Sequence, residues 1–212
     1  MSIRKGAAWG APGALAAGAP LYRDDRSAAD ALQRAVDDGA QLGDLGEIGL
    51  LGGDLHRTLG APRHDEQDLR DGRAMRFPMD LGEVRLDGGA PQLFVAHLVA
   101  TRTADGRLWS GRTIIAMNAS FRDELDLGPR SHPGDGRLDV TDGSLPLGER
   151  RAGRRRARTG SHVPHPQLRE RRVRQLEIEL DRPLHVRLDG ELVGRARRLE
   201  LRCLADAVVV VV

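Results

Sequence analysis

The chain has few aromatic residues, one cysteine and one lysine. Phe, Trp and Tyr make up only 3% of its 212 residues. The core must therefore consist of Leu, Val, Ile and Ala, and too few rings remain for a sheet that stacks RNA bases. Cys203 is the only cysteine, which excludes an intrachain disulfide. Lys5 is the only lysine, so a Gly-Lys-Ser/Thr phosphate loop is absent and any phosphate must be bound by arginine, backbone amides or a metal.

Long hydrophobic runs are also missing. Residues 11–19 are rich in Ala, Gly and Pro rather than Leu, so we expect a flexible start and no secretory signal. The valine run 208–212 is too short to span a bilayer. A single cysteine fits the cytosol, and we expect a cytoplasmic protein that could lie at the periphery of a membrane.

Apolar periodicity predicts an α+β fold in two parts. Residues 27–38 favour a helix that Ser27 caps and Gly39 ends, residues 48–51 favour a strand, and a short helix follows Gly52-Gly53 and ends at Gly60. From about residue 77 the runs become short and alternating. They predict strands over residues 81–86, 93–99, 113–117, 138–141, 176–180, 184–188, 191–194, 199–203 and 207–212. We expect a reduced α/β region over residues 1–76 and an antiparallel β-sandwich over residues 77–212.

Arginine is concentrated in residues 150–174. A solvated, mobile loop explains this as well as a surface for an anionic partner does. Lipid headgroups and nucleic acid are both compatible with the arginine pattern, and nucleic acid, which would show a steep dependence on salt, is the weaker interpretation.

Two acidic turns are candidates for chemistry. Asp135 and Asp139 bracket a turn that leads into a strand, where carboxylates and a backbone carbonyl could hold Mg²⁺. Glu191 follows the hairpin signal Asp189-Gly190, where it could accept a proton from a substrate hydroxyl. Taken alone, each is more often an ordinary Asp-Gly turn.

The order of these motifs resembles that of the bacterial diacylglycerol/lipid kinase family, whose superfamily includes sphingosine kinase-like and NAD kinase-like proteins. Residues 49–62 resemble the family's second glycine loop, Gly-x-x-Pro-x-Gly-Thr-x-Asn-Asp-x-Ala-Arg-x-Leu-Gly. Four further segments follow in the family's order, and together they cover most of residues 28–212. These segments are residues 80–94, 115–121, 132–140 and 188–194.

The resemblance implies transfer of a phosphoryl group from ATP to a lipid hydroxyl, such as that of diacylglycerol, with Mg²⁺. It implies that Glu191 is the general base. It further implies that Gly52, Gly53, Asp54 and Arg57 belong to the nucleotide and substrate loop, and that Asp135, the Leu138 carbonyl and Asp139 bind the metal. These roles require Asp135, Asp139 and Glu191 to lie close together.

The sequence departs from the family in its glycine loops. The first loop, Gly-Gly-Asp-Gly-Thr, has no counterpart between Ala40 and Ile48, and the second has lost its Thr-x-Asn element. Without an amide cradle or a lysine, the charge on a transferred phosphoryl group is poorly matched. Two hypotheses follow: a degenerate lipid kinase, which a homodimer or a partner chain would complete, or a catalytically silent homologue that binds lipid or a partner.

Overall fold

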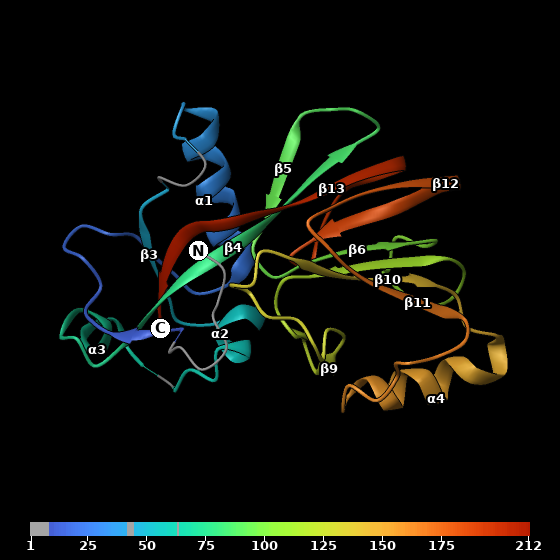
Figure 1. Cartoon of the computed structure of the whole chain (residues 1–212), viewed down its shortest axis with the longest axis horizontal. Coiled ribbons are helices and arrows are strands. Elements are labelled where there is room, and N and C mark those ends of the chain that lie inside the picture. The colour runs from blue at the N-terminus through green and yellow to red at the C-terminus, as the bar shows by residue number, and fades with distance from the viewer. Residues whose placement is uncertain (1–8, 42–44, 63) are drawn as a thin grey trace.

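The computed structural model describes residues 9–41, 45–62 and 64–212. Its helices are α1 (Asp25–Asp37), α2 (Asp54–Thr58), α3 (Glu66–Arg70) and α4 (Leu147–Ala157). The strands of the N-terminal half are β1 (Ala11–Pro12), β2 (Leu21–Tyr22), β3 (Glu47–Leu50), β4 (Met75–Leu86), β5 (Pro91–Phe94) and β6 (His97–Thr101). The remaining strands are β7 (Thr113–Met117), β8 (Phe121–Arg122), β9 (Leu125–Asp126), β10 (Leu138–Gly143), β11 (Leu168–Val173), β12 (Gln175–Leu188) and β13 (Glu191–Val211) (Figure 1).

Most of the fold is antiparallel β-sheet. Within the described residues, eleven strands form one sheet in the order β1-β4-β13-β12-β6-β7-β10-β11, with β5 on β4, β3 on β13 and β2 on β3, while β8 and β9 form a separate pair. Only the β2–β3 and β3–β13 pairs are parallel. The antiparallel character predicted for residues 77–212 is confirmed, and helices are few.

The sheet curves over its own core instead of splitting into the two sheets of the expected sandwich. Val84 of β4 and Leu138 of β10 belong to one buried cluster, although four strands separate β4 from β10 in the sheet order. Register shifts between Glu179 and Leu184 and between Leu204 and Val208 bend the two longest strands, as bulges do. Because it bends, a single sheet encloses the core that we had expected to find between two sheets.

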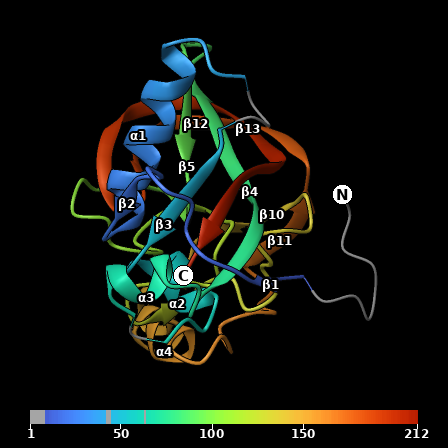
Figure 2. The ribbon, with the colours of Figure 1, turned by 90° about the vertical axis from the view of Figure 1, so that its left-hand side faces the viewer.

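The N-terminal region is a small α/β unit. Strand β2, helix α1 and strand β3 follow one another, and β2 and β3 pair in parallel, as expected for a crossover that contains a helix. Ala28, Ala29 and Leu32 of α1 are buried in a cluster with Ile48 and Leu50 of β3. Figure 2 shows α1 beside β2, β3 and β5, with α2 and α3 at the lower end of the same unit.

Strand β13 joins this unit to the rest of the sheet. Its first half pairs with β12, and its end pairs with β3 at Val209, Val210 and Val211. The predicted strands 191–194, 199–203 and 207–212 are therefore one strand of 21 residues. As a result, the sheet that α1 covers contains the last residues of the chain.

Several predicted elements have different limits in the structure. The helix predicted from Ser27 begins at Asp25, because the Asp24 carboxylate, not Ser27, caps it by accepting the Ser27 N–H at 2.8 Å. The arginine-rich segment, for which we had left a mobile loop open, contains the eleven-residue helix α4. No helix within residues 9–41, 45–62 and 64–212 is long and apolar enough to cross a membrane.

Candidate functional site

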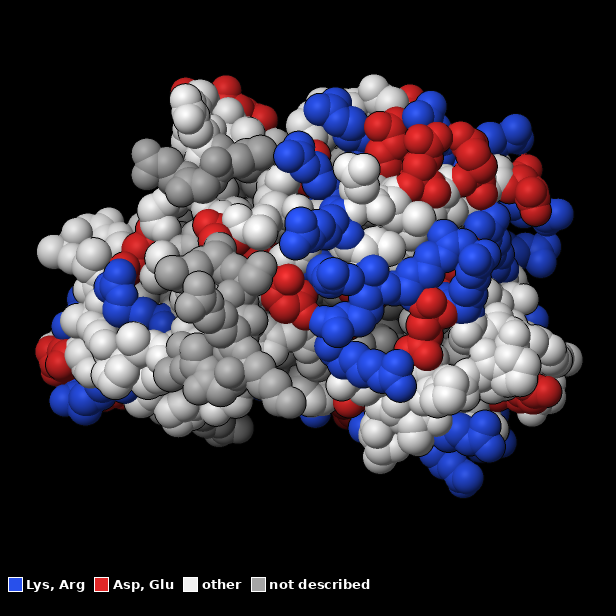
Figure 3. All heavy atoms as spheres, in the orientation of Figure 1, with Lys and Arg blue, Asp and Glu red and all other residues white. Residues whose placement is uncertain are grey.

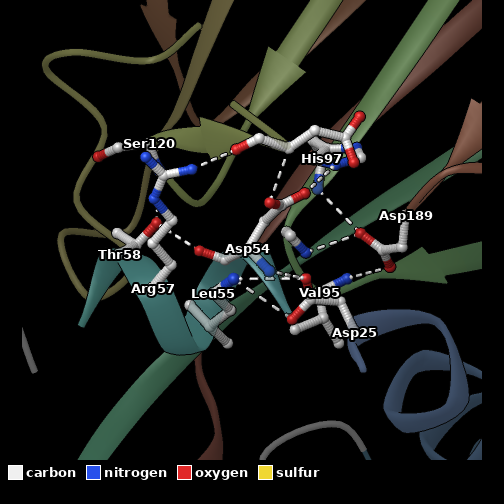
Figure 4. Close-up of polar contacts among 11 residues, drawn as sticks. Asp25, Asp54, Leu55, Arg57, Thr58, Val95, His97, Ser120 and Asp189 are labelled. Carbon is white, nitrogen blue, oxygen red and sulfur yellow. Dashed lines mark hydrogen bonds and ion pairs between the residues drawn. The ribbon is translucent and has the colours of Figure 1, made fainter. Parts of the chain in front are cut away.

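Four polar side chains gather where the α/β unit meets the sheet (Figure 4). This polar cluster consists of Asp25 at the start of α1, Asp54 at the start of α2, His97 at the start of β6 and Asp189 in the β12–β13 turn. Asp25 is 5% exposed and His97 2%. Buried ionisable groups are rarely placed together without a role in structure or chemistry.

Two glycines allow the approach of the chain segments that carry Asp25 and Asp54. A Cβ on Gly52 would lie 2.5 Å from the Arg23 carbonyl oxygen, and one on Gly53 would lie 2.5 Å from the Asp25 carboxylate. Gly53 also has a φ of 99°, which favours glycine. The Gly52-Gly53 turn therefore packs directly against residues 23–25.

The Asp25 carboxylate caps the start of α2. One of its oxygens accepts the Asp54 N–H at 2.5 Å, and both lie 3.3 Å from the Leu55 nitrogen. Burial, together with the charge of Asp189, raises the pKa of Asp25 to about 8 despite the Asp54 N–H bond. Asp25 is therefore mostly neutral at pH 7. It occupies the amides that would otherwise face an anion at this helix start.

Asp54 and His97 form an ion pair with a separation of 3.0 Å between Oδ2 and Nε2. Burial opposes the charge of Asp54, but the His97 hydrogen bond and charge lower the pKa of this carboxyl overall. Burial likewise opposes the charge of His97, but bonding to Asp54 and the charges of Asp189 and Asp54 raise the pKa of the imidazole. The charged pair is thus favoured, while the buried His97 Nδ1 has no hydrogen-bond partner in the described part of the chain.

The second oxygen of Asp54 holds the β8–β9 turn. It accepts the Asp123 N–H at 2.8 Å, and the Arg57 guanidinium donates to the Asp123 carbonyl. Arg57 also lies 4.0 Å over the Phe121 ring. Both site residues predicted from α2 therefore have partners within the protein.

Asp189 has a role that its hairpin position did not reveal. It has a φ of 47° and precedes Gly190 with a φ of 88°, as in the predicted two-residue turn. Its carboxylate turns inward and accepts the N–H groups of Val95, Ala96 and His97 at 2.8 to 2.9 Å. These bonds end β5 and start β6, which divides the predicted strand 93–99 in two.

Glu191, the predicted base, lies on the surface beside α1. Its side chain is 60% exposed and its Oε2 is 2.9 Å from the Arg26 Nε. Arg26 is in the first turn of α1 and also pairs with Asp30. The structure therefore brings Glu191 to the α/β unit that carries Asp25 and Asp54.

Asp135 and Asp139 lie elsewhere. Asp139 of β10 pairs with Met117 of β7, and Met117 pairs with His97 of β6. The His97 carbonyl in turn accepts the N–H of Asp189 in the β12–β13 turn. Along the sheet, three strand spacings therefore separate Asp139 from the turn before Glu191, a path of about 14 Å. Asp135 and Asp139 pair with Arg172, whereas Glu191 pairs with Arg26, so these contacts do not join Glu191 to the acidic turn.

Arg172 pairs with both carboxylates of the acidic turn. Its guanidinium pairs with Asp135 and lies 3.2 Å from an Asp139 oxygen, while Asp80 holds the turn by accepting the Gly136 N–H at 2.6 Å. Leu138 is buried as the first residue of β10. No group of three or more His, Cys, Asp or Glu able to hold a metal occurs within the described ranges. As arranged, Asp135, Leu138 and Asp139 do not fit a Mg²⁺ ion, because the Arg172 guanidinium already pairs with both carboxylates.

Sequence reasoning missed the loop before α1. We sought a first glycine loop between Ala40 and Ile48, a stretch that includes residues 42–44 outside the described residues. The structure shows that the first strand–loop–helix sequence is β2, residues 23–24 and α1. Residues 23–27 there read Arg-Asp-Asp-Arg-Ser. The available signal for Asp25 was an acidic residue between a short apolar run and a helix.

The fold is of the diacylglycerol kinase type. The chain is similar to a solved structure from Bacillus anthracis str. Sterne called a "putative diacylglycerol kinase", with a TM-score of 0.59, 14% identity, and 77% of this chain and 69% of that one covered. A second such structure gives 0.55 at 13% identity, with 77% and 68% covered. A third, called a diacylglycerol kinase, gives 0.53 at 13% identity, with 77% and 66% covered.

Sequence comparison gives no further assignment. No family model matches the chain, and no curated protein matches it. At 13 to 14% identity the likeness to solved structures concerns the fold, and function must be argued from the site.

Proposed function

We propose that this chain is a diacylglycerol kinase-like protein whose phosphotransferase activity is degenerate. The reaction of such a fold would be ATP- and Mg²⁺-dependent phosphorylation of a lipid hydroxyl, with Mg-ATP supplying the phosphoryl group. In support, the Gly52-Gly53 turn, Asp54 and the Glu191 hairpin converge on one end of the α/β unit. Arg26 and Arg57 are the cations next to these groups.

The expected loss of activity rests on the hydrogen bonds that the α2 amides donate to Asp25. Phosphate binding at a glycine turn needs free backbone N–H groups and space above the glycines. Here the Asp25 carboxylate accepts those N–H groups, and residues 23–25 fill the space beside both glycines. The residues present therefore do not fit the phosphates of ATP in this arrangement.

A catalytically silent homologue that binds lipid or a partner is the second candidate. The β2–α1 loop favours it, because this loop consists of Arg23 and Asp24 and contains no glycine. Asp24 is already used as the cap of α1. Because the Asp24 side chain accepts a backbone N–H at the start of α1, fewer of these N–H groups are free to bind a nucleotide.

Turnover on diacylglycerol in detergent micelles with Mg-ATP tests the proposal. We expect little or no phosphorylation above background by the wild-type chain. Weak turnover that Glu191→Gln abolishes would support a degenerate enzyme, and no turnover in either protein would support the silent homologue. The control is Glu177→Gln, which also neutralises an exposed strand carboxylate but lies away from the α/β unit.

Robust phosphorylation would overturn the proposal. The decisive form would be a high rate in the wild type and in Glu177→Gln that falls about 10²–10⁴-fold in Glu191→Gln, the usual cost of losing a general base. Glu191 would then be the working base and the Asp25 contact no obstacle.

A further inference from the structure

Helix α4 presents a dense row of arginines to solvent. Gly153 and Ala157 face inward, and a Cβ on Gly153 would lie 2.5 Å from Leu145. The opposite, exposed face carries Arg151, Arg154 and Arg155, followed by Arg158 at the C-terminal cap. Their spacing places them side by side on a helix.

The charge of this row is largely uncompensated. Of the four arginines, only Arg158 has an acidic partner in the described chain, Glu124 at 3.4 Å. Residues 150–158 include no acidic residue. Figure 3 shows a second basic band over the strands on the same half of the molecule, but acidic groups interrupt that band. Among the strand arginines, Arg172 pairs with Asp135, and Arg198 pairs with Glu177.

A groove of about 880 Å³ lies between this row and the β8–β9 turn. Its lining includes Arg151, Arg154, Arg155 and Arg158 of the row and Asp123, Glu124 and Leu125 of the turn. Arginines therefore outnumber carboxylates in the lining by four to two. Asp123 of that turn donates its N–H to Asp54. The groove is therefore one residue away from the polar cluster and is large enough for a lipid headgroup.

We infer that the α4 face docks on an anionic phospholipid bilayer and that the groove receives a headgroup phosphate. The inference rests on the proposed lipid kinase-like function for the choice of a bilayer. A second observation supports that choice: Leu147, the first residue of α4, is 79% exposed. An exposed leucine beside several arginines adds one apolar contact with the membrane interface to the charge of this face. Among the residues that line the groove, no aromatic side chain offers a surface for stacking bases.

Binding to vesicles of phosphatidylglycerol and phosphatidylcholine tests this inference without ATP or diacylglycerol. We expect the wild-type chain to bind anionic vesicles, to lose binding as salt rises and to ignore pure phosphatidylcholine. Each basic residue near an anionic surface contributes about fivefold, so the triple variant Arg151→Gln, Arg154→Gln, Arg155→Gln should bind about 100-fold more weakly. Leu147→Ser should weaken vesicle binding and leave any binding to duplex DNA unchanged.

The matched control removes the same charge from residues 169–174, which comprise most of β11 and the residue after it. Arg169→Gln, Arg171→Gln, Arg174→Gln carries three equivalent substitutions outside the α4 face, and we expect it to retain most vesicle binding. Equal losses in the two triple variants, no binding to anionic vesicles, or tighter binding to duplex DNA than to vesicles would each overturn the inference. Because vesicle binding requires no turnover, a protein without kinase activity can still confirm or contradict the inference.

Discussion

At the scale of single residues, Asp25 is the group whose ionisation matters most for the site. Its folded-state pKa of about 8 lies far above the ordinary value of 3.8. The folded chain therefore holds a proton that the unfolded chain releases between these two values. The stabilising contribution of Asp25 is complete below about pH 4 and is lost as the pH rises through 8.

Asp25→Asn should remove this pH dependence. Relative to the wild type, the free energy of unfolding of the variant should rise with pH by up to about 1.4 kcal/mol per unit between pH 5 and 8. Urea denaturation at several pH values measures this difference. Asp181→Asn, which alters an exposed carboxylate, should track the wild type. Parallel curves for the wild type and Asp25→Asn would show that Asp25 is ionised in the fold.

Arg172 makes a second residue-scale prediction. Because its guanidinium pairs with Asp135 and Asp139, EDTA and Mg²⁺ should leave the melting temperature of the wild type unchanged. Arg172→Gln leaves two carboxylates without a cation, so we expect a loss of about 1 kcal/mol, modest because the pair is partly exposed, and partial recovery in Mg²⁺. Arg169→Gln on the same strand should show neither effect. Stabilisation of the wild type by Mg²⁺ would restore the predicted metal turn.

At the scale of elements, the contact between the β2–α1 loop and the Gly52-Gly53 turn is the tightest in the site. Gly53→Ala and Gly60→Ala form a matched pair, because both glycines have positive φ but only Gly53 has neighbours at its Cβ position. Gly60→Ala should cost about 1 kcal/mol of stability from backbone strain, and Gly53→Ala about 2–4 kcal/mol because a clash is added. Equal midpoints in urea would contradict the packing described for Asp25.

The sequence predicted where helices and strands lie better than it predicted which strands are continuous or pair with one another. The helix at 27–38 and its stop at Gly39 were readable because apolar spacing and glycine are local signals. The sequence did not predict that three strands merge into β13, since pairing partners and bulges depend on distant residues. In the site, the resemblance to the family's second glycine loop pointed to Asp54 and Arg57, but not to the contacts that these residues make. The roles of Asp25, His97 and Asp189 were missed because each bonds to a segment at least 29 residues away.

At the scale of the whole molecule, β13 makes the α/β unit and the curved sheet depend on one another. The two tryptophans report on each part: Trp9 stacks on Phe77 near the unit, and Trp109 is 1% exposed in the core under α4. In Trp9→Phe and in Trp109→Phe, the remaining tryptophan's fluorescence and the far-ultraviolet circular dichroism should give the same urea midpoint. Separate midpoints within either variant would support the predicted division at residue 76 as two independent domains.

The same dependence places the candidate site in a rigid setting. Asp25 comes from the α/β unit, while His97 and Asp189 come from the curved sheet. Their contacts span the junction between the two parts, so a nucleotide could enter only if Asp25 left the α2 amides. Under the proposed function, the Asp25 carboxyl group closes the place where a kinase of this fold would bind phosphate.

Nucleotide binding by the wild-type chain, measured as a thermal shift with and without Mg²⁺, shows whether Asp25 closes this place. A ligand at a hundredfold excess over its dissociation constant adds about 2.7 kcal/mol to the free energy of unfolding, which is readily seen as a rise in melting temperature. We predict no shift with millimolar ATP, with or without Mg²⁺. A clear, saturable shift with Mg-ATP that Gly53→Ala abolishes would contradict the account and show that the glycine turn still binds nucleotide.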